Sequence, residues 1–477
     1  MPSLLTPPLG QISSDHLEAI RAHFDRPAVA STHASRSYRR LLAHYYNLLI
    51  HPNSSVLEVG CGDGELLARI RAREKTGIDL SEAQLSRARM RLPEGRFYAQ
   101  AGELLSLPEI FDVIIVSETL NFAADAQRFL DQLATVAAPH TRLILNFHNT
   151  LWRPIFKLGE WMGIRSRSPA ISWLSSKDIQ NLLELSRWET IKHQTRILWP
   201  IDTPLLAPLL NRWITPFVPF LGLAIFNVSR LRPSATPAPL SVSVVIPARN
   251  EAGNIEAAVL RTPQMGSFTE LIFVEGHSKD NTWEEIERVR QAYPSLRIKT
   301  LRQTGYGKGN AVREGYAVAQ GDVLMILDAD LTMPPEELPK FYEAIASGKA
   351  EFANGSRLVY PMGKAAMQFL NMIANKFFGV AFSWLLGQAV KDTLCGTKVL
   401  RRSDYFSIAA NRSYFGDFDP FGDFDLLFGA DKQNLKIRDI PIRYRERTYG
   451  STNINRWRHG LLLFRMLAFA AKKLKFI

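Results

Sequence analysis

The chain has 477 residues, 46% hydrophobic and 22% charged, which is an ordinary globular composition with enough apolar residues for large cores. At roughly 100–200 residues per domain, this length predicts two or three domains. Glycine and proline, at 29 and 27 residues, are too few for a collagen-like or largely disordered chain. Two cysteines, Cys61 and Cys395, exclude a disulfide-stapled secreted scaffold and favour a reducing, cytoplasmic setting.

The net charge points to an anionic partner. Lysine and arginine number 58 against 46 acids, a formal charge of +12, which suits nucleic acid, a membrane surface or a phosphorylated substrate. Residues 432–477 hold twelve basic side chains and two acids, so +10 of the charge lies in this final segment. Because the rest of the chain is nearly neutral, we expect no nucleic-acid partner.

Membrane crossing is not expected from the sequence. Residues 1–11 lack a basic segment followed by an apolar run, so we expect no signal peptide. A spanning helix needs about 20 apolar residues. The longest uncharged apolar stretch, 213–229, contains two prolines, and the stretch 365–390 is interrupted by Lys376. Attachment to a membrane face stays open, and 365–390 is a candidate pair of interfacial helices.

A proline-rich segment predicts the division of the chain. Residues 232–240 combine proline with small residues and are predicted to form a linker. The linker separates a first domain, 1–231, from a second, 241–455, and a tail of residues 456–477 follows. Each half begins with an apolar strand and then alternates apolar runs with helical patterns, which predicts two α/β domains with mainly parallel sheets.

The first half contains a glycine turn. A strand that carries Glu58 runs into Gly60, Gly62 and Gly64, and a helical pattern follows directly. Glycines at this spacing let the backbone turn tightly and approach a ligand closely. The next strand ends in Asp79, about 20 residues on, where a carboxylate can hold a ribose diol.

Two later strands deliver polar residues to the same edge. Strands predicted at 111–116 and 142–148 place Glu118 and His148 at their carboxyl ends, where open α/β sheets bind ligands. The apolar, proline-broken segment 204–227 walls an acceptor pocket, faces a membrane or packs in the core; the sequence leaves these alternatives open.

Residues 40–150 resemble class I S-adenosylmethionine-dependent methyltransferases, which have a Rossmann-like fold. The resemblance implies a cofactor site formed by Glu58, Gly60, Gly62, Gly64, Asp79 and Glu103. In this family the glycines surround the methionine part and the acid at Asp79 binds the ribose. Glu103 lies near the expected adenine position, where the family usually has Asp. Methyl transfer needs mainly alignment of nucleophile and methyl group, so His148 is a candidate base without being required.

The second half contains two carboxylates at the end of a buried strand. A strand at 242–246 leads into a polar loop in which Asn250 is expected to cap a helix. A later strand delivers Asp328 and Asp330, two residues apart. Such acids supply hard oxygen ligands to Mg²⁺ or Mn²⁺, and the cation neutralises a diphosphate.

Residues 241–455 look like inverting GT-A glycosyltransferases of the family that includes dolichyl-phosphate mannose synthase and other polyprenyl-phosphate glycosyltransferases. The resemblance implies a nucleotide-sugar site formed by Pro247, Ala248, Arg249, Glu251, Glu275, Lys308, Asp328 and Asp330. The last two would also surround the metal, with Asp330 in the catalytic set. Glu275-Gly276 replaces the commoner Asp-Asp pair of the family.

Two arginines match phosphate-binding motifs of the same family. Arg357 ends the segment that meets the acceptor phosphate, and Arg447 begins the late R-x-x-G-x-S-type motif. Arginine suits this role because its planar fork makes bidentate bonds to oxyanions; a surface ion pair is the alternative. Among Asp392, Asp423 and Asp425, Asp423 is the preferred base for a hydroxyl acceptor. A lipid phosphate would need no strong base, and the acids would then hold a loop.

The tail has a basic amphipathic pattern. Arg458, Arg465 and Lys472 are seven residues apart and form one helical stripe, and an apolar stripe lies beside it. The apolar stripe consists of Trp457, Leu461, Phe464 and Ala468. Such a helix suits an anionic bilayer surface. The alternative is a final helix packed on its own domain with solvated charges.

Together these features predict a bifunctional enzyme on the cytoplasmic face of a membrane. The first half would transfer methyl from S-adenosylmethionine, and the second would transfer a sugar from a nucleotide donor, with inversion, to polyprenyl phosphate or a related membrane-linked acceptor. Two rivals remain: a glycosyltransferase with a soluble or polysaccharide acceptor beside an independent or non-catalytic first half, and a non-catalytic membrane adaptor.

Overall fold

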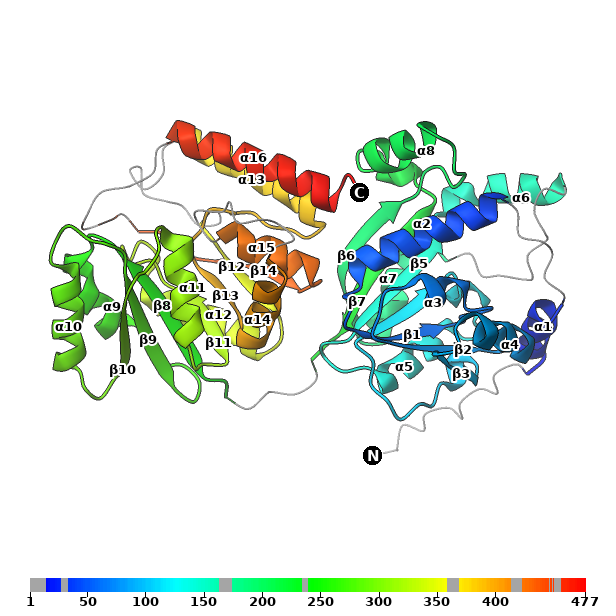
Figure 1. Ribbon diagram of the computed structural model, residues 1–477, viewed down its shortest axis with the longest axis horizontal. Helices are drawn as coiled ribbons and strands as arrows, with labels where there is room; N and C mark the ends of the chain where they lie inside the picture. The colour runs from blue at the N-terminus through cyan, green and yellow to red at the C-terminus, as the bar shows by residue number, and fades with distance from the viewer. Residues whose placement is uncertain are drawn as a thin grey trace, which may run out of the picture. The chain divides into compact units, whose positions relative to one another are not determined.

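A computed structural model describes residues 14–26, 33–162, 174–233, 239–357, 369–412, 423–445, 447, 449 and 456–477. The chain forms two compact units, Met1–Arg232 and Pro233–Ile477 (Figure 1). Each unit is built on its own seven-stranded mixed sheet. Residues 234–238 of the predicted linker lie outside the described residues.

The sheet of the first unit has the strand order β3-β2-β1-β4-β5-β7-β6. Its strands are β1 (Ser55–Val59), β2 (Glu74–Asp79), β3 (Arg96–Ala99), β4 (Val113–Ser117), β5 (Arg142–His148), β6 (Trp188–Arg196) and β7 (Ala224–Leu231). Strands β1 to β5 pair in parallel, and β7 is antiparallel to both β5 and β6. The central strands are buried on both faces, and most of their residues are apolar.

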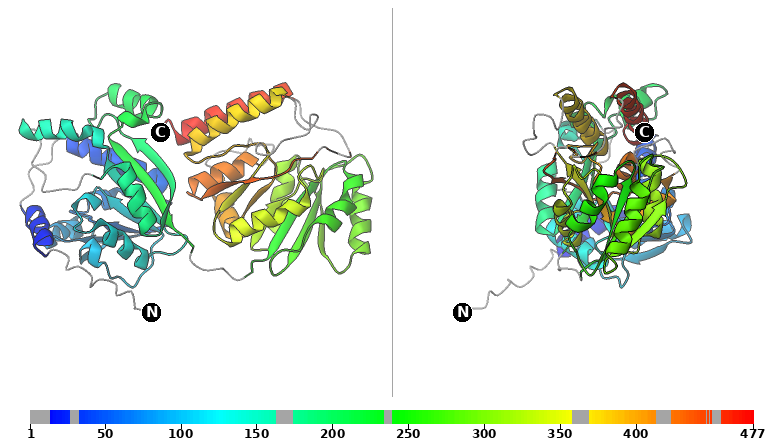
Figure 2. Two further views of the ribbon diagram at one scale, coloured as in Figure 1. Left: turned by 180° about the vertical axis from the view of Figure 1, so that it is seen from behind. Right: turned by 90° about the vertical axis from the view of Figure 1, so that its left-hand side faces the viewer.

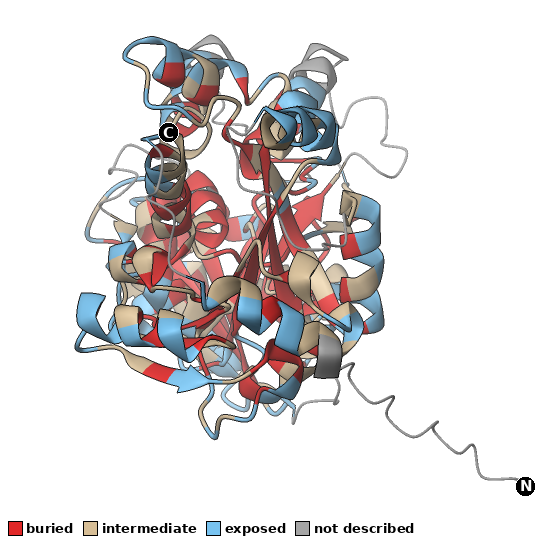
Figure 3. Cartoon of the chain, turned by 90° about the vertical axis from the view of Figure 1, so that its right-hand side faces the viewer, coloured by how far each residue is buried: buried red, intermediate tan, exposed pale blue. Residues whose placement is uncertain are grey.

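Helices cover both faces of this sheet. The helices of the first unit are α1 (Ser14–Phe24), α2 (His33–Leu49), α3 (Glu65–Arg69), α4 (Glu82–Arg91), α5 (Ala126–Leu133), α6 (Arg153–Trp161), α7 (Ser176–Leu185) and the short α8 (Leu206–Pro208). Ser81 caps α4 by accepting the backbone N–H of Gln84 at 3.1 Å. Two separate apolar clusters lie on opposite sides of the sheet, one including Tyr46 and the other Trp188. Figure 3 shows burial concentrated on the strands.

The sheet of the second unit has the order β10-β9-β8-β11-β13-β12-β14. Its strands are β8 (Val242–Ala248), β9 (Thr269–Glu275), β10 (Arg297–Arg302), β11 (Val323–Ile326), β12 (Phe352–Ser356), β13 (Lys398–Arg401) and β14 (Ile437–Pro441). Strand β13 is antiparallel to its neighbours β11 and β12, and the remaining pairs are parallel. The prediction of two α/β domains is confirmed, and the sheets are mixed.

The helices of the second unit are α9 (Ile255–Arg261), α10 (Thr282–Ala292), α11 (Lys308–Val318), α12 (Leu338–Ala346), α13 (Phe369–Leu386), α14 (Arg402–Ala410), α15 (Asp423–Lys432) and α16 (Arg456–Leu474). Helices α13 and α16 lie side by side, and their rings meet at Phe377 and Phe464, 5.8 Å apart (Figures 1 and 2). The stretch 365–390 thus contributes one long helix to the described part of the chain. None of the helices described is both long and apolar enough to cross a membrane.

The expected helix cap at Asn250 is wrong. Asn250 has a left-handed backbone with φ of 56°, and its side chain accepts the N–H of Lys279 at 2.7 Å. The chain therefore stays irregular after β8, and a 3₁₀ turn, Ala252–Asn254, precedes α9. This path brings the Glu251 N–H to the hydroxyl of Thr282 at 2.9 Å.

Candidate functional sites

The glycine turn of the first unit requires its glycines. Gly60, Gly62 and Gly64 have φ of 76°, 53° and 72°, the left-handed region that other residues adopt at a cost. A Cβ at Gly60 would overlap the side chain of Thr119, whereas a Cβ at Gly62 would meet no atom within 4 Å. The loop is therefore closely packed at Gly60 and open at Gly62, where a ligand can approach the backbone.

Asp79 ties the glycine turn to the end of β2. Its carboxylate accepts the backbone N–H of Gly62 at 2.8 Å and that of Ser81 at 2.9 Å. Burial raises the pKa of Asp79, while these backbone hydrogen bonds oppose the rise. Because Val59 pairs with Ile78 in the parallel register, the turn and the acid share one sheet edge.

Glu58 is a buried acid beside the same turn, and it is 2% exposed. Its Oε2 atom has no hydrogen-bond partner. Burial raises the pKa of Glu58 well above its ordinary value, and the charges of Asp79 and Asp63 raise it further. A buried polar atom without a partner is costly, so Glu58 marks a place where a ligand donor would be favourable.

Glu103 follows β3 in a 3₁₀ turn, Gly102–Leu104, and is buried. Its Oε1 atom accepts the backbone N–H of Ala124 at 2.8 Å, so one carboxylate oxygen holds a neighbouring segment.

A polar cluster that the sequence did not bring together lies at the ends of β4 and β5. Tyr38, from α2, donates its hydroxyl to Glu118, and His148 Nε2 lies 3.1 Å from the same Glu118 oxygen. Asn146 donates to that oxygen at 3.3 Å. Burial opposes ionisation, but the charge and hydrogen bond of His148 and the bonds from Tyr38 and Asn146 lower the pKa of Glu118 to about 2. Tyr38 was missed because it lies 80 residues before Glu118.

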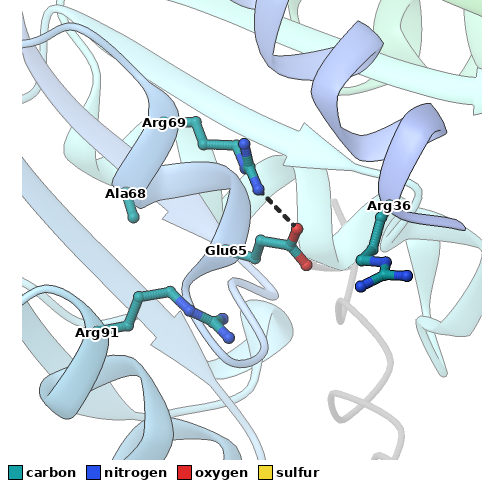
Figure 4. Close-up of a pocket in the computed structure, with 5 residues that line it drawn as sticks. All are labelled: Arg36, Glu65, Ala68, Arg69 and Arg91. Atoms are coloured by element: carbon teal, nitrogen blue, oxygen red, sulfur yellow. Dashed lines mark hydrogen bonds and ion pairs between the residues drawn. The ribbon is translucent and has the colours of Figure 1, made fainter. Parts of the chain in front are cut away.

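A basic depression borders the other side of the glycine turn. Figure 4 shows Arg36, Arg69 and Arg91 around Glu65, the first residue of α3. Glu65 pairs with Arg69 at 3.2 Å. This ion pair lies within one turn of the loop and stabilises the start of α3, where an acid is favourable.

In the second unit, three strands deliver the predicted nucleotide-sugar residues to one edge. Ala248 pairs with Glu275 in the parallel register of β8 and β9, so Pro247 and Arg249 lie at the level where β9 ends. The Glu275 carboxylate accepts the N–H of Ser278 at 2.5 Å. Ala248 is buried, Arg249 is exposed, and Pro247 and Asn250 are half-buried.

The two carboxylates after β11 each face a cation. Lys308, at the start of α11, lies 2.6 Å from Asp328 Oδ1. Arg447 donates to Asp330 Oδ2 at 2.6 Å and to Glu251 at 2.9 Å. Burial raises the pKa of Glu251, and Asn254 and Arg447 oppose the rise. Residues far apart in the sequence thus form one cluster of three acids and two cations.

Arg357 is engaged in a buried ion pair with Asp392. Its Nε and Nη2 atoms donate to the two oxygens of Asp392 at 2.7 and 2.9 Å. Burial opposes both charges, but the pairing lowers the pKa of Asp392 and raises that of Arg357. Asp392 is fully buried in this pair and is therefore poorly placed as a general base.

The other predicted acids begin α15. Asp425 is buried and lies 2.6 Å from Arg412, just after α14, and 3.5 Å from Arg313 on α11, so it links α15 to both segments. Asp423 is the first residue of α15, and its side chain lies outside the described residues.

The outer surface of α13 and α16 is both apolar and basic. Its exposed apolar side chains are Phe377, Val380, Leu461 and Phe464. Its exposed cations are Lys376, Arg465 and Lys472. The opposite face of α16 packs into the core through Leu463, Met466 and Ala470. The side chains of Trp457 and Arg458 lie outside the described residues.

One edge of each sheet therefore gathers the candidate site residues, a glycine turn in the first unit and paired carboxylates in the second. Residues 32–193 match the family model described as a methyltransferase domain. Residues 243–407 match the model of glycosyl transferase family 2. The chain thus contains a methyltransferase domain and a glycosyltransferase domain.

The chain is also similar to two transferases named for polyprenyl-type phosphates. The chain is 40% identical over 123 residues to a dolichol-phosphate mannosyltransferase of Pyrococcus furiosus, covering 25% of this chain and 34% of that protein. It is 27% identical over 227 residues to an undecaprenyl-phosphate 4-deoxy-4-formamido-L-arabinose transferase of Pseudomonas aeruginosa, covering 47% of this chain and 63% of that protein. The chain thus spans between about a third and two thirds of these relatives.

Solved structures resemble each half. A glucosyl-3-phosphoglycerate synthase from Mycobacterium tuberculosis aligns with a TM-score of 0.36 and 19% identity over 49% of this chain and 80% of that chain. A methyltransferase from Thermotoga maritima aligns with a TM-score of 0.32 and 18% identity over 41% of this chain and 98% of that chain.

Proposed function

We propose that the chain is a bifunctional enzyme. Its first unit would transfer methyl from S-adenosylmethionine, and its second would transfer a sugar, with inversion and with a divalent metal, from a nucleotide-sugar to polyprenyl phosphate or a related membrane-linked acceptor. The observation that carries the second activity is the cluster in which Asp328 and Asp330 face Lys308 and Arg447. The names of the two relatives, a dolichol-phosphate and an undecaprenyl-phosphate transferase, support the acceptor class.

The first unit fits S-adenosylmethionine at the glycine turn. The open space at Gly62 and the unpartnered oxygen of Glu58 suit a ligand with ammonium or hydroxyl donors. In this proposal Gly60, Gly62 and Gly64 bind the methionine part, Asp79 orients the ribose and Glu103 lies toward the adenine. The bound cofactor supplies a methyl group on a sulfonium, and the protein aligns the acceptor with that methyl.

The second unit fits a nucleotide-sugar at the edge shared by β8, β9 and β11. In this proposal the loop of Pro247, Ala248, Arg249 and Glu251 binds the nucleotide together with Glu275. Lys308 and Arg447 stabilise the negative charge that develops on the diphosphate, because cations placed at the leaving group favour the transition state. Arg357 would donate hydrogen bonds to the acceptor phosphate through the N–H groups of its guanidinium that do not bind Asp392.

A divalent cation fits the donor set of Asp328 and Asp330. Mg²⁺ and Mn²⁺ are commonly held by one or two carboxylates and completed by substrate phosphates and water. Across the described ranges no group of three His, Cys, Asp or Glu side chains stands ready to hold a metal, so the nucleotide would complete the site. The bound cation would neutralise the diphosphate, while Asp330 keeps its hydrogen bonds from Thr332.

The acceptor decides whether a base is required. A polyprenyl phosphate is already ionised near neutral pH, which agrees with the pairing of Asp392 and Asp425 to arginines. A soluble hydroxyl acceptor would need a free carboxylate, with Asp423 as the candidate, and this is the rival function.

The outer face of α13 and α16 supports a proposal of peripheral membrane attachment. Exposed aromatic and aliphatic side chains beside cations suit the headgroup region of an anionic bilayer, and each cation near the surface contributes about 1 kcal/mol. Cosedimentation of the full chain with phosphatidylglycerol vesicles tests this. Replacing Phe464 by Ser and Arg465 by Glu should release the chain, and the control Arg288→Glu on α10 should not. Binding that survives the first change would contradict the assignment.

Mass spectrometry of sugar transfer tests the main proposal. The full chain is incubated with Mn²⁺, a panel of sugar nucleotides and either polyprenyl phosphate or free sugars, with and without S-adenosylmethionine. Transfer to polyprenyl phosphate that disappears in Asp330→Ala supports the proposal. The control Asp202→Ala changes an exposed acid of the first unit and should retain transfer. Product only with free sugars would favour the rival, and unchanged transfer by Asp330→Ala would refute the metal assignment.

A further inference from the structure

We propose that Tyr38, Glu118 and His148 form the acceptor-activating site of the methyltransferase unit, and that its acceptor is an alcohol carried on an apolar chain. His148 would be the general base, and Glu118 and Tyr38 would position it. The inference rests on the proposed S-adenosylmethionine-dependent activity and adds the class of methyl acceptor to it.

The cluster lies beside the glycine turn. Glu118 directly precedes Thr119, whose side chain occupies the space that a Cβ at Gly60 would need. Glu118 itself has a left-handed backbone, φ of 58°, at the carboxyl end of β4. A strained backbone at a strand end is a common feature of functional sites. The cluster therefore borders the space in which the reacting methyl group would lie.

The imidazole of His148 is held in one orientation with one nitrogen free. Nε2 lies 3.1 Å from Glu118 Oε1 and 3.3 Å from the Tyr38 hydroxyl. The Tyr38 ring stacks on it at 5.9 Å, and Phe156 meets its edge at 5.0 Å. Within the described part of the chain, Nδ1 has no hydrogen-bond partner. A carboxylate on one nitrogen sets the tautomer that leaves the other as a base.

The chemistry assigns different roles to the two ionisable groups. Glu118 accepts hydrogen bonds from Tyr38 and Asn146, which favour its charged form and make it a weak base. Asn146 is fixed in turn, because Tyr46 and Ser117 each donate to its carbonyl oxygen at 2.7 Å. An imidazole can accept a proton at the nitrogen that faces away from its carboxylate partner, and the anion beside it stabilises the imidazolium that forms.

The transfer step balances with these groups. The acceptor oxygen forms a bond to the methyl carbon as the carbon–sulfur bond breaks, and that electron pair stays on sulfur. The hydroxyl proton passes to Nδ1 of His148. The positive charge that began on the sulfonium ends on an imidazolium paired with Glu118. A carboxylate or phosphate acceptor carries no such proton, so the base is required for an alcohol.

The surroundings of His148 indicate an apolar acceptor. Helix α6 follows β5 shortly after His148. Trp152, at the start of α6, donates its Nε1–H to the carbonyl of Leu221 at 2.8 Å, so α6 meets the 3₁₀ turn Pro219–Leu221 near the site. Their side chains remain exposed, with Ile155 at 54%, Trp161 at 82% and Phe220 at 63%. Exposed apolar surface beside a polar site marks a binding surface. An acceptor with a hydrocarbon chain would cover these residues while its hydroxyl reaches His148.

Nitrogen-detected NMR of the full chain labelled with ¹⁵N-histidine tests the arrangement without turnover. At pH 8, His148 should have its proton on Nε2, and Glu118→Gln should lower the pKa of His148 by about one unit or more. The matched control is His140→Gln, which removes an exposed histidine of the same unit and should leave the His148 signals unchanged. A proton on Nδ1, or a pKa that Glu118→Gln does not change, would overturn the proposal.

Product analysis tests the acceptor class. Octyl glucoside, octylamine and octanoic acid share one apolar chain and differ in the nucleophile, and mass spectrometry identifies the methylated product. We expect the methyl ether of octyl glucoside, reduced about 10²-fold in His148→Gln, retained in His140→Gln and less reduced in Tyr38→Phe. A methylated amine, a methyl ester or no product from all three would overturn the inference.

Calorimetry with S-adenosylmethionine distinguishes a failure of the proposed methyltransferase function from a failure of the acceptor assignment alone. Wild type and His148→Gln should bind the cofactor equally. A wild-type chain that does not bind it would defeat the proposed function itself, whereas binding without the ether product would defeat only the acceptor assignment.

Discussion

Asp392 is the centre of a buried ion pair whose loss should destabilise the glycosyltransferase unit. Its carboxylate accepts from Arg357 Nε, Nη2 and backbone N–H at 2.7, 2.9 and 3.0 Å, and from Leu394 N–H at 3.1 Å. The side chain of Asp392 is fully buried and that of Arg357 is 12% exposed. Removing one partner of such a pair costs about 3–5 kcal/mol, because the other charge stays buried without compensation. We expect this loss for Asp392→Ala.

Hydrogen–deuterium exchange of the full chain measures that loss at β12 and β13. Since 1.4 kcal/mol corresponds to a factor of ten, a loss of about 3–5 kcal/mol should make exchange there roughly 100- to 4,000-fold faster. Glu336→Ala is the matched control, because it breaks an exposed bidentate pair with Arg261, whose loss should cost less than about 1 kcal/mol. Replacing Arg357 by Met together with Asp392→Leu should recover much of the protection. The reasoning would be refuted if Asp392→Ala accelerated exchange at β12 and β13 no more than Glu336→Ala accelerates exchange around Glu336.

Three further results are expected. Mn²⁺ should bind at least tenfold more tightly with a nucleoside diphosphate than alone, because Asp328 and Asp330 leave coordination positions for phosphate; calorimetry would contradict this by giving equal affinities. Gly62→Ala should weaken S-adenosylmethionine binding at a stability cost of about 1–2 kcal/mol, whereas thermal unfolding should show a larger cost for Gly60→Ala, whose methyl group meets a side chain. The pKa of Glu118 is lowered from an ordinary 4.5 to about 2, so its ionised form stabilises the fold above about pH 4.5, and that stability is lost as the pH falls toward 2. In Glu118→Gln, stability measured by near-ultraviolet circular dichroism should therefore depend less on pH between about 4.5 and 2.

Much of the fold could be predicted because its signals are local. Strands such as Val113–Ser117 and Val323–Ile326 are buried along most of their length, and a strand buried on both faces is a nearly continuous apolar run in the sequence. The glycine turn is also local, since left-handed backbone angles select glycine at each position. Strand β7 was not predicted, because its residues follow an apolar, proline-broken segment whose burial depends on the antiparallel partners β5 and β6.

Candidate site residues could be located from the sequence where they follow a strand or belong to a motif, but their partners could not. Glu118 and His148 were located by their strand ends, but the partner that joins them, Tyr38, comes from a helix that precedes the whole sheet. Arg357 was interpreted as a phosphate ligand from its motif, and the structure adds its partner Asp392, 35 residues later. Pattern and spacing describe what a side chain can do, whereas tertiary packing determines which of its donors are already used.

A prediction from the net charge of residues 432–477 has the same limit, because net charge counts charged residues without regard to their partners. Lys436 is buried, and Arg447 binds Glu251 and Asp330, so neither contributes to an open basic surface. Arg465 and Lys472 are exposed on α16. A segment that reads as one cationic block is therefore divided between charges that compensate acids inside the site and charges available to an anionic surface. Salt should therefore weaken vesicle binding through Arg465 and Lys472 far more than it weakens the ion pairs of Arg447, because screening acts mainly on solvent-exposed charges.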